Sequence, residues 1–248
     1  MVSGTDSNSE FTMKPILYNL LSGVKMQLNA EQILQSTYEL ALTFYEEEEF
    51  DSAIKTLEKL PTTVDTANLL GCCHAELMNP VEAEKAYLQA IENNSKDPTP
   101  WHNLAMLYDQ FFQPFEAKQA YEKLFKLKSD DVVALFEYAC VLLQLNMEDE
   151  AYDVLKKAHQ LDPYDECVII NLAVILCHKK QRPRIALRML KSALAISPMD
   201  AELLYHVAIT AWDMGEELTC LQARDILCPI DPEKCAELDE RTGRQNWN

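Results

Sequence analysis

The sequence predicts an all-α protein built from repeated pairs of helices. Residues that favour helix, chiefly Ala, Leu, Glu, Lys and Gln, are abundant, and the 248 residues include only 5 glycines. Runs of Val, Ile and Thr with the two-residue period of strands are scarce. Small and aromatic residues also recur about every 34 residues. The segment 97–124, DPTPWHNLAMLYDQFFQPFEAKQAYEKL, is one copy, with Trp101, Ala105, Ala117 and Tyr121 at recurring positions.

The recurring small residues predict close contact between two helices in each copy. They occupy one position in the first half of the copies, Gly71, Ala105, Ala139 and Ala173, and one in the second half, Ala83, Ala117, Ala151 and Ala186. Pro163, Pro198 and Pro232 follow later copies and are expected to stop the second helix, because proline lacks an N–H and clashes with the preceding turn. A single pair cannot bury its apolar face, so neighbouring pairs are expected to stack.

A helix, a turn and a second helix in about 34 residues form the tetratricopeptide repeat (TPR) pattern, and the chain resembles this family from about Leu34 to Pro232. The resemblance implies an all-α, right-handed superhelix, or solenoid, spanning 34–232. The predicted units are about 34–63, 64–97, 98–131, 132–165, 166–200 and 201–234. In the last unit Cys220 and Arg224 depart from the pattern, and Pro229 is expected to interrupt the second helix early.

The ends of the chain are expected to differ from the repeats. Residues 1–12 are polar and patternless, which predicts a disordered leader or an artificial addition. Residues 13–33 are predicted to form an amphipathic helix, the alternative being a signal peptide in which Lys14 precedes apolar residues. Residues 235–248 are predicted to be a C-terminal cap and tail.

Charge and cysteine usage limit the classes of partner and compartment. The formal net charge is −18, so nucleic acid is not expected to bind, whereas a basic or apolar protein segment is. No apolar run is long enough to span a bilayer, so membrane insertion is not expected. The 8 cysteines form no CxxC pair, and several fall where a helix would bury them. They predict reduced thiols in a cytoplasmic protein rather than a disulfide framework.

The candidate binding site follows from the family resemblance, which implies that fixed positions of each first helix line a concave groove. These positions hold Tyr38, Asn68, Cys72, His102, Met106, Asp109, Phe136, Cys140, Leu143, Gln144, Ile170, Val174, Cys177, Tyr205, Ile209 and Trp212. Most are apolar or aromatic, which indicates that an apolar segment of a partner protein binds there. Two alternatives stay open: the chain's own N-terminal segment covers the strip, or a second copy does so in a homo-oligomer.

Two TPR subclasses give more specific hypotheses. One binds the carboxylate tails of heat-shock chaperones with Lys, Asn and Arg, but the matching positions here hold Tyr38, Leu42, Thr99, Asn103, Val133 and Glu137, so this function is not expected. Residues 17–128 also resemble class II chaperones of type III secretion, on the segment LLSGVKMQLNAEQILQSTYELALTFYEEEEFDSA and on DPTPWH at 97–102. That resemblance implies a groove for an apolar translocator segment, although that family has about three repeats rather than six.

No pattern in the sequence indicates catalysis. Gly-rich phosphate loops and nucleophile elbows are absent, so we expect neither an enzyme nor a cofactor. Adjacent residues on a helix point about 100° apart, so Cys72, Cys73 and His74 are not expected to hold a metal together. One basic cluster comprises Lys179, Lys180, Arg182, Arg184 and Arg188; it is predicted to be a solvated turn or a docking patch for an acidic partner. The sequence therefore predicts a non-enzymatic interaction scaffold or adaptor.

Overall fold

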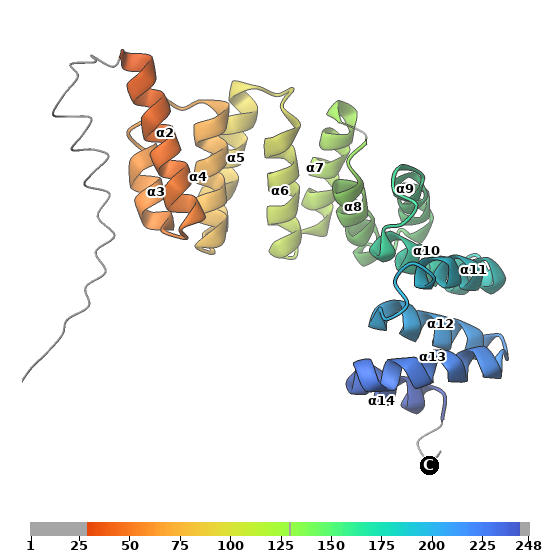
Figure 1. Cartoon of the computed structure of the whole chain (residues 1–248). Helices are drawn as coiled ribbons and strands as arrows, with labels where there is room; N and C mark the ends of the chain where they lie inside the picture. The colour runs from red at the N-terminus through yellow and green to blue at the C-terminus, as the bar shows by residue number, and fades with distance from the viewer. Residues whose placement is uncertain (1–28, 129, 244–248) are drawn as a thin grey trace, which may run out of the picture. The chain divides into compact units, whose positions relative to one another are not determined.

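A computed structural model describes residues 29–128 and 130–243, in which thirteen α-helices and no strands occur (Figure 1). The first helices of six pairs are α2 (Ala30–Glu46), α4 (Val64–Glu76), α6 (Pro98–Gln110), α8 (Val132–Gln144), α10 (Glu166–His178) and α12 (Ala201–Asp213). The second helices are α3 (Phe50–Leu57), α5 (Pro80–Asn93), α7 (Pro114–Leu127), α9 (Glu148–Leu161), α11 (Pro183–Leu194) and α13 (Glu217–Ile230), and α14 (Pro232–Arg241) follows them. The predicted all-α repeat fold is confirmed.

The chain divides into two compact units, Met1–Pro61 and Thr62–Asn248. The first contains α2 and α3. The leader predicted at 1–12, and the predicted amphipathic helix up to residue 28, lie outside the described residues.

Helix α2 begins earlier than the predicted start of the first unit at about 34. Asn29 caps it: its side chain accepts from the Gln32 N–H at 2.8 Å, and the Gln32 side chain accepts from the Asn29 N–H at 3.0 Å. This reciprocal capping satisfies two N–H groups that the first turn leaves unpaired. The helix therefore starts at Ala30, inside the segment predicted to precede the repeats.

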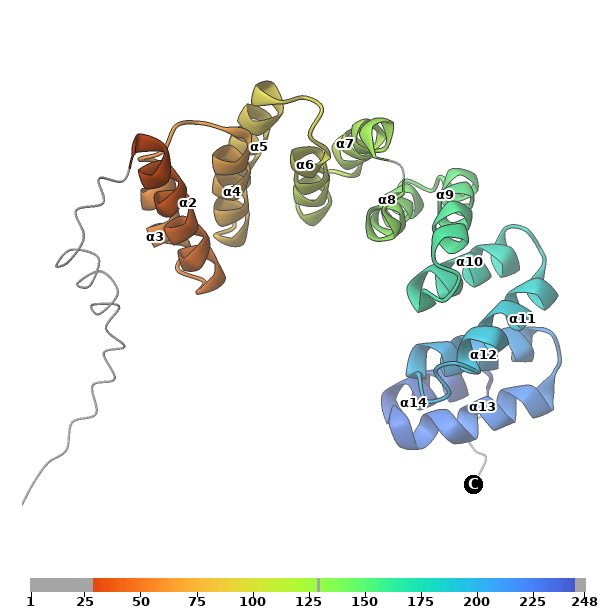
Figure 2. The same cartoon turned by 45° about the horizontal axis from the view of Figure 1, so that its top comes forward.

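The second unit, Thr62–Asn248, contains five pairs and α14. Its first helices begin at the residues where the predicted units begin, and each is capped by the side chain before it. The capping residues are Thr63, Asp97, Asp131, Asp165 and Asp200. Figure 2 shows α4, α6, α8, α10 and α12 in one row, with α5, α7, α9 and α11 in a second row along its outer side. We call the surface of the first row the first-helix face.

Small residues bring the two helices of each pair together, as the sequence predicted. Gly71 is buried, and the recurring alanines named above, together with Ala208 and Cys220 in the last pair, are at most 1% exposed. Large side chains such as Tyr121, Leu155 and Leu190 are also at most 1% exposed. Burial of such side chains contributes roughly 1.5–3 kcal/mol each.

Each pair turns through one residue with left-handed backbone geometry. These residues are Glu48, Met78, Phe112, Asn146 and Gln181, with φ between 52° and 60°, and Gly215, with φ of 76°. Only the last pair uses glycine, the residue that adopts this region without steric cost. The sequence does not reveal that this left-handed geometry recurs in every pair, because the turn position holds a different residue type each time.

Replacing Phe112 with Gly is expected to raise the free energy of unfolding by about 0.5–1 kcal/mol, because it relieves the left-handed strain of a residue with a Cβ. The Phe112 side chain is 91% exposed, so little packing is lost. The control is Gly215→Phe, which places the same side chain in the same geometry and should be destabilising. Urea denaturation of both variants measures the effect, and a less stable Phe112→Gly variant would contradict it.

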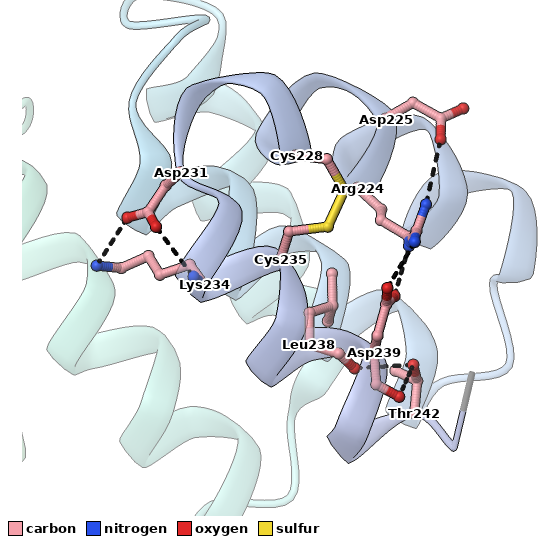
Figure 3. The surroundings of a disulfide bond; sticks show 9 residues. All are labelled: Arg224, Asp225, Cys228, Asp231, Lys234, Cys235, Leu238, Asp239 and Thr242. Carbon is pink, nitrogen blue, oxygen red and sulfur yellow. Dashed lines mark hydrogen bonds and ion pairs between the residues drawn. A yellow bond between two sulfur atoms is a disulfide. The ribbon is translucent and has the colours of Figure 1, made fainter. Parts of the chain in front are cut away.

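The C-terminal helices correct two sequence predictions. Cys228 and Cys235 form a disulfide between α13 and α14, so not all thiols are reduced (Figure 3). The short connection turns the chain back and leaves the two Cα atoms 4.9 Å apart, within the range that a disulfide requires. Helix α13 also continues through Pro229 to Ile230. Because Pro229 lies in the last turn, its missing N–H removes only one terminal hydrogen bond.

The unusual arginine of the last unit has a partner in α14. Arg224 stands where other units have an aromatic or Leu residue, and its guanidinium donates two hydrogen bonds of 2.5 Å to the Asp239 carboxylate (Figure 3). Bidentate pairs of this kind fix geometry as well as adding energy. The C-terminal cap was predicted to begin at residue 235, whereas α14 begins at Pro232. The Cys228–Cys235 disulfide and the Arg224–Asp239 pair join α14 to α13.

Denatured protein without reductant is expected to show six free thiols, and reduction should raise the number to the full 8. The double variant Cys228→Ser/Cys235→Ser should lose roughly 2–3 kcal/mol from the stability of the C-terminal helices, since the cross-link no longer restricts the unfolded chain. Thiol titration with a chromogenic disulfide reagent and thermal denaturation measure these values. Eight reactive thiols before reduction would refute the pair. Disulfides persist mainly in oxidising compartments, so the cytoplasmic location stays a prediction.

Candidate functional site

The predicted groove residues of the second unit fall in three rows along the first-helix face. Equivalent positions of successive helices form each row: Asn68, His102, Phe136, Ile170 and Tyr205; Cys72, Met106, Cys140, Val174 and Ile209; and Asp109, Leu143, Cys177 and Trp212. Gln144 adjoins the third row. Tyr38 lies on α2 in the first unit, where it is half-buried. The rows combine polar residues with Cys72 and the 45% exposed Met106 on α4 and α6, and they are mainly apolar on α8, α10 and α12.

Hydrogen bonds join neighbouring first helices across this face. The bonds run from Asn103 Nδ2 to Asn68 Oδ1 (2.9 Å), from Gln144 Nε2 to Asp109 Oδ1 (2.8 Å) and between His102 Nε2 and Glu137 Oε2 (2.6 Å). Each joins residues 35 apart in the sequence. Equivalent or adjacent positions of α4, α6 and α8 therefore lie in contact, and the polar groups there bind one another.

Glu137 is the centre of the polar part of the face. Its Oε2 faces His102 and accepts from the Tyr121 hydroxyl at 3.2 Å. Burial, and then the Glu137 charge, raise the pKa of Tyr121, so this hydroxyl remains a donor. The cluster fastens α6, α7 and α8 to one another. We assign this cluster a structural role.

The apolar part of the face is open on α8 and α10. Val133 on α8 is 60% exposed and Val174 on α10 is 36% exposed. Phe136 and Cys140 on α8 and Ile170 on α10 occupy the neighbouring row positions and are half-buried. We call these five residues the α8–α10 patch. Phe136 and Ile170 pack against the core, while the two valines present methyl groups to solvent.

Sequence reasoning missed Val133 as a candidate. It is the second residue of α8, one of the positions that the family resemblance assigns to the groove, so the pattern could have identified it. Cys167, the second residue of α10, is exposed at the same position. Both widen the patch toward the start of the two helices.

The end of the face at α12 is covered. Tyr205 and Ile209 are each only 7% exposed, and both belong to the core cluster that contains Leu238 of α14. The Tyr205 hydroxyl donates to Glu237, and Lys234 Nζ lies 2.9 Å from Glu202 Oε1. The prediction that Tyr205 and Ile209 face an open groove is therefore wrong, because α14 occupies the place that a further first helix would take.

A small cavity remains where α10, α12 and α14 meet. Its volume is about 190 Å³, and Val174, Cys177, His206 and Arg241 are among its lining residues. Burial lowers the pKa of His206, which favours the neutral imidazole there. The space suits a single side chain and adjoins the α8–α10 patch through Val174.

The cysteines of the first-helix face are poorly suited to reaction or to metal binding. Burial raises the pKa of Cys72 and of Cys140 on this face, and it raises the pKa of the neighbouring, fully buried Cys73 to about 12. A thiol held protonated is a weak nucleophile and a weak ligand. No group of three His, Cys, Asp or Glu side chains in the described residues is placed to hold a metal ion.

No described helix combines the length and the apolar character that crossing a bilayer requires.

Comparisons with known proteins identify the repeat. A sequence model of the tetratricopeptide repeat matches residues 98–131. PilF of Pseudomonas aeruginosa is 17% identical, with a TM-score of 0.70, over 85% of this chain and 98% of that chain. YrrB, a TPR protein with an unusual peptide-binding site, is 18% identical, with a TM-score of 0.64, over 75% of this chain and 96% of that chain.

A tetratricopeptide repeat protein from Parabacteroides merdae ATCC 43184 is 17% identical, with a TM-score of 0.64, over 88% of this chain and 94% of that chain. No curated protein sequence matches the chain. With a matched repeat at 98–131 and the same helix-pair architecture throughout the described residues, the chain is a protein of the tetratricopeptide repeat fold.

Proposed function

We propose that this protein is a non-enzymatic scaffold that binds an apolar segment of a partner protein on the α8–α10 patch. The observation that supports the proposal is the exposure of Val133 and Val174 on neighbouring first helices, beside half-buried Phe136. A peptide laid across two helices can bury these side chains together. Apolar and aromatic groups at the centre of such an interface commonly supply most of its binding energy.

The surroundings of the patch favour a partner segment with basic flanks. The chain carries a net charge of −18, and Glu137 and Asp109 lie on the polar side of the same face. Complementary charge mainly speeds encounter and selects among partners, whereas apolar contact supplies most of the affinity. YrrB, whose fold is similar, is described as having a peptide-binding site, which is in keeping with this use of the fold.

The rival hypotheses place something else on the patch. A second copy of the chain would make it a homo-oligomer interface, and the chain's own N-terminal segment would make it self-covered. The secretion-chaperone hypothesis shares the groove but implies about three repeats, whereas the described part of the chain contains six helix pairs. We therefore retain the general scaffold.

Site-specific photo-crosslinking tests the proposal. A benzophenone amino acid replaces Val133 or, as the control, Val81, which is the second residue of α5 and is 71% exposed. We expect Val133 to capture a distinct partner protein and Val81 to capture none. Mass spectrometry of the cross-linked peptides distinguishes the rivals: a cross-link to another copy or to residues 1–28 would replace the external partner. Equal capture by both positions would refute the patch.

A further inference from the structure

The second-helix side of the fifth pair carries an isolated basic region. Residues 167–199 contain no Asp or Glu and six Lys or Arg, in a chain whose net charge is −18. Arg182, Arg184 and Arg188 are three of the five arginines in the described residues. The concentration of positive charge on and before α11 contrasts with the rest of the chain.

Three of these cations line one cavity. Arg184, Arg188 and Lys191 are spaced by four and three residues on α11, so they project from the same side of the helix. With Met214 and Glu216 from the turn between α12 and α13, they line an open surface pocket of about 540 Å³. Its lining also includes the apolar side chains of Leu187 and Ala195.

The two arginines of the cavity are not neutralised within the described residues. Lys179, Lys180 and Lys191 have carboxylate partners, in Glu148, Asp149 and Glu216 respectively. Arg184 and Arg188, both exposed, form no ion pair with any residue that the structure describes. Like charges four residues apart disfavour a helix, so local stability does not explain this pair.

We propose that the cavity on α11, which we call the α11 pocket, binds an acidic peptide segment that carries an apolar side chain between carboxylates. Guanidinium groups match carboxylates in bidentate geometry, and the apolar lining accepts a side chain such as Leu. The site lies on second helices and is separate from the α8–α10 patch, so it does not rest on the proposed function.

An acidic protein segment fits the pocket better than a nucleic acid does. Nucleic-acid binding draws most of its affinity from many phosphate contacts along an extended basic surface. Within the pocket only Arg184 and Arg188 lack a carboxylate partner among the described residues, and the chain as a whole would repel a polyanion. A short segment with a few carboxylates requires only the local charge.

Fluorescence anisotropy with labelled peptides tests the proposal on the full chain. The probe is a fluorescein-labelled peptide in which two Glu residues stand on each side of one Leu, and its control has Gln in place of Glu. We expect saturable binding of the Glu peptide and at least about tenfold weaker binding of the Gln peptide, because only carboxylates accept charge-assisted bonds from arginine.

Matched variants locate the binding site. Arg184→Gln/Arg188→Gln should weaken binding of the Glu peptide by about tenfold or more, since both charged donors are lost. Lys156→Gln/Lys157→Gln removes the same charge from exposed residues of α9 that do not line the pocket and should change binding by less than about twofold, since solvent screens charges that do not contact the peptide. Ala195→Glu should also weaken binding, because it places a carboxylate in the cavity without altering an arginine.

Several outcomes would overturn the α11 pocket. These are an absence of saturable binding to the native protein, equal binding of the Gln peptide, and equal loss in the α9 control. If a labelled oligothymidylate bound through Arg184 and Arg188 while the Glu peptide did not, the pocket would be a nucleic-acid site instead. Far-ultraviolet circular dichroism verifies that each variant is folded.

Discussion

Replacing Gly71 with Leu is expected to lower the free energy of unfolding by about 3 kcal/mol or more, because the new side chain overpacks the core. A Cβ atom at Gly71 would lie 2.4 Å from Cε1 and 2.5 Å from Cδ1 of Tyr87. That ring is only 3% exposed, and its hydroxyl donates to Cys72 Sγ at 3.6 Å, so it has little room to move. Leu is a better helix former than Gly by nearly 1 kcal/mol, so the measured loss understates the cost of overpacking.

A graded series and a double-mutant cycle make this prediction specific. Gly71→Ala should already be destabilising, because its Cβ alone would meet the Tyr87 ring, and Gly71→Leu should cost more, because the longer side chain adds to the same clash. In a Tyr87→Ala background the cost of Gly71→Leu should shrink, since the ring that it meets is gone. Urea denaturation monitored by circular dichroism measures all the variants. The same cost in both backgrounds would show that Tyr87 does not limit the space.

The repeat register was predictable because it depends on steric rules that leave a mark in the sequence. Wherever two helices touch, as at Ala139 and Ala173, a small residue is required, and its recurrence sets the phase of every later pair. The backbone geometry of the turns was not predictable, because residues as different as Phe112 and Asn146 adopt it. The pairing of Cys228 with Cys235 depends on how α14 folds back, which no spacing motif records.

The candidate site was predictable only in part. The resemblance assigns positions on each first helix, and those on α8 and α10 do present apolar side chains that are partly open. It treats every unit alike, however, so it could not show that α14 buries Tyr205 and Ile209. It also could not show that His102 and Asp109 are engaged by Glu137 and Gln144 of the next helix, because such contacts depend on both helices together.

The double variant Val133→Asp/Val174→Asp is expected to weaken partner binding by about 2 kcal/mol or more, the loss typical of the best sites in an interface. Both side chains are partly exposed in the free protein, so their replacement should alter the stability far less than Gly71→Leu does. A carboxylate in the patch must be desolvated when an apolar segment covers it, and this cost falls on the complex alone. Phe136→Ala should add to the loss, since Phe136 lies on the same face of α8.

The control for this variant is Val81→Asp/Leu88→Asp on α5. Val81 and Val133 are each the second residue of a helix, and the exposures of the control pair, 71% and 41%, resemble the 60% and 36% of Val133 and Val174. Both variants add two negative charges, so long-range repulsion of an acidic partner, or attraction of a basic one, changes equally. Affinity for the partner identified by photo-crosslinking, measured by titration calorimetry, should fall only for the patch variant. If both variants lost affinity equally, added charge rather than loss of the apolar surface would explain the result, and the α8–α10 patch would not be the binding site.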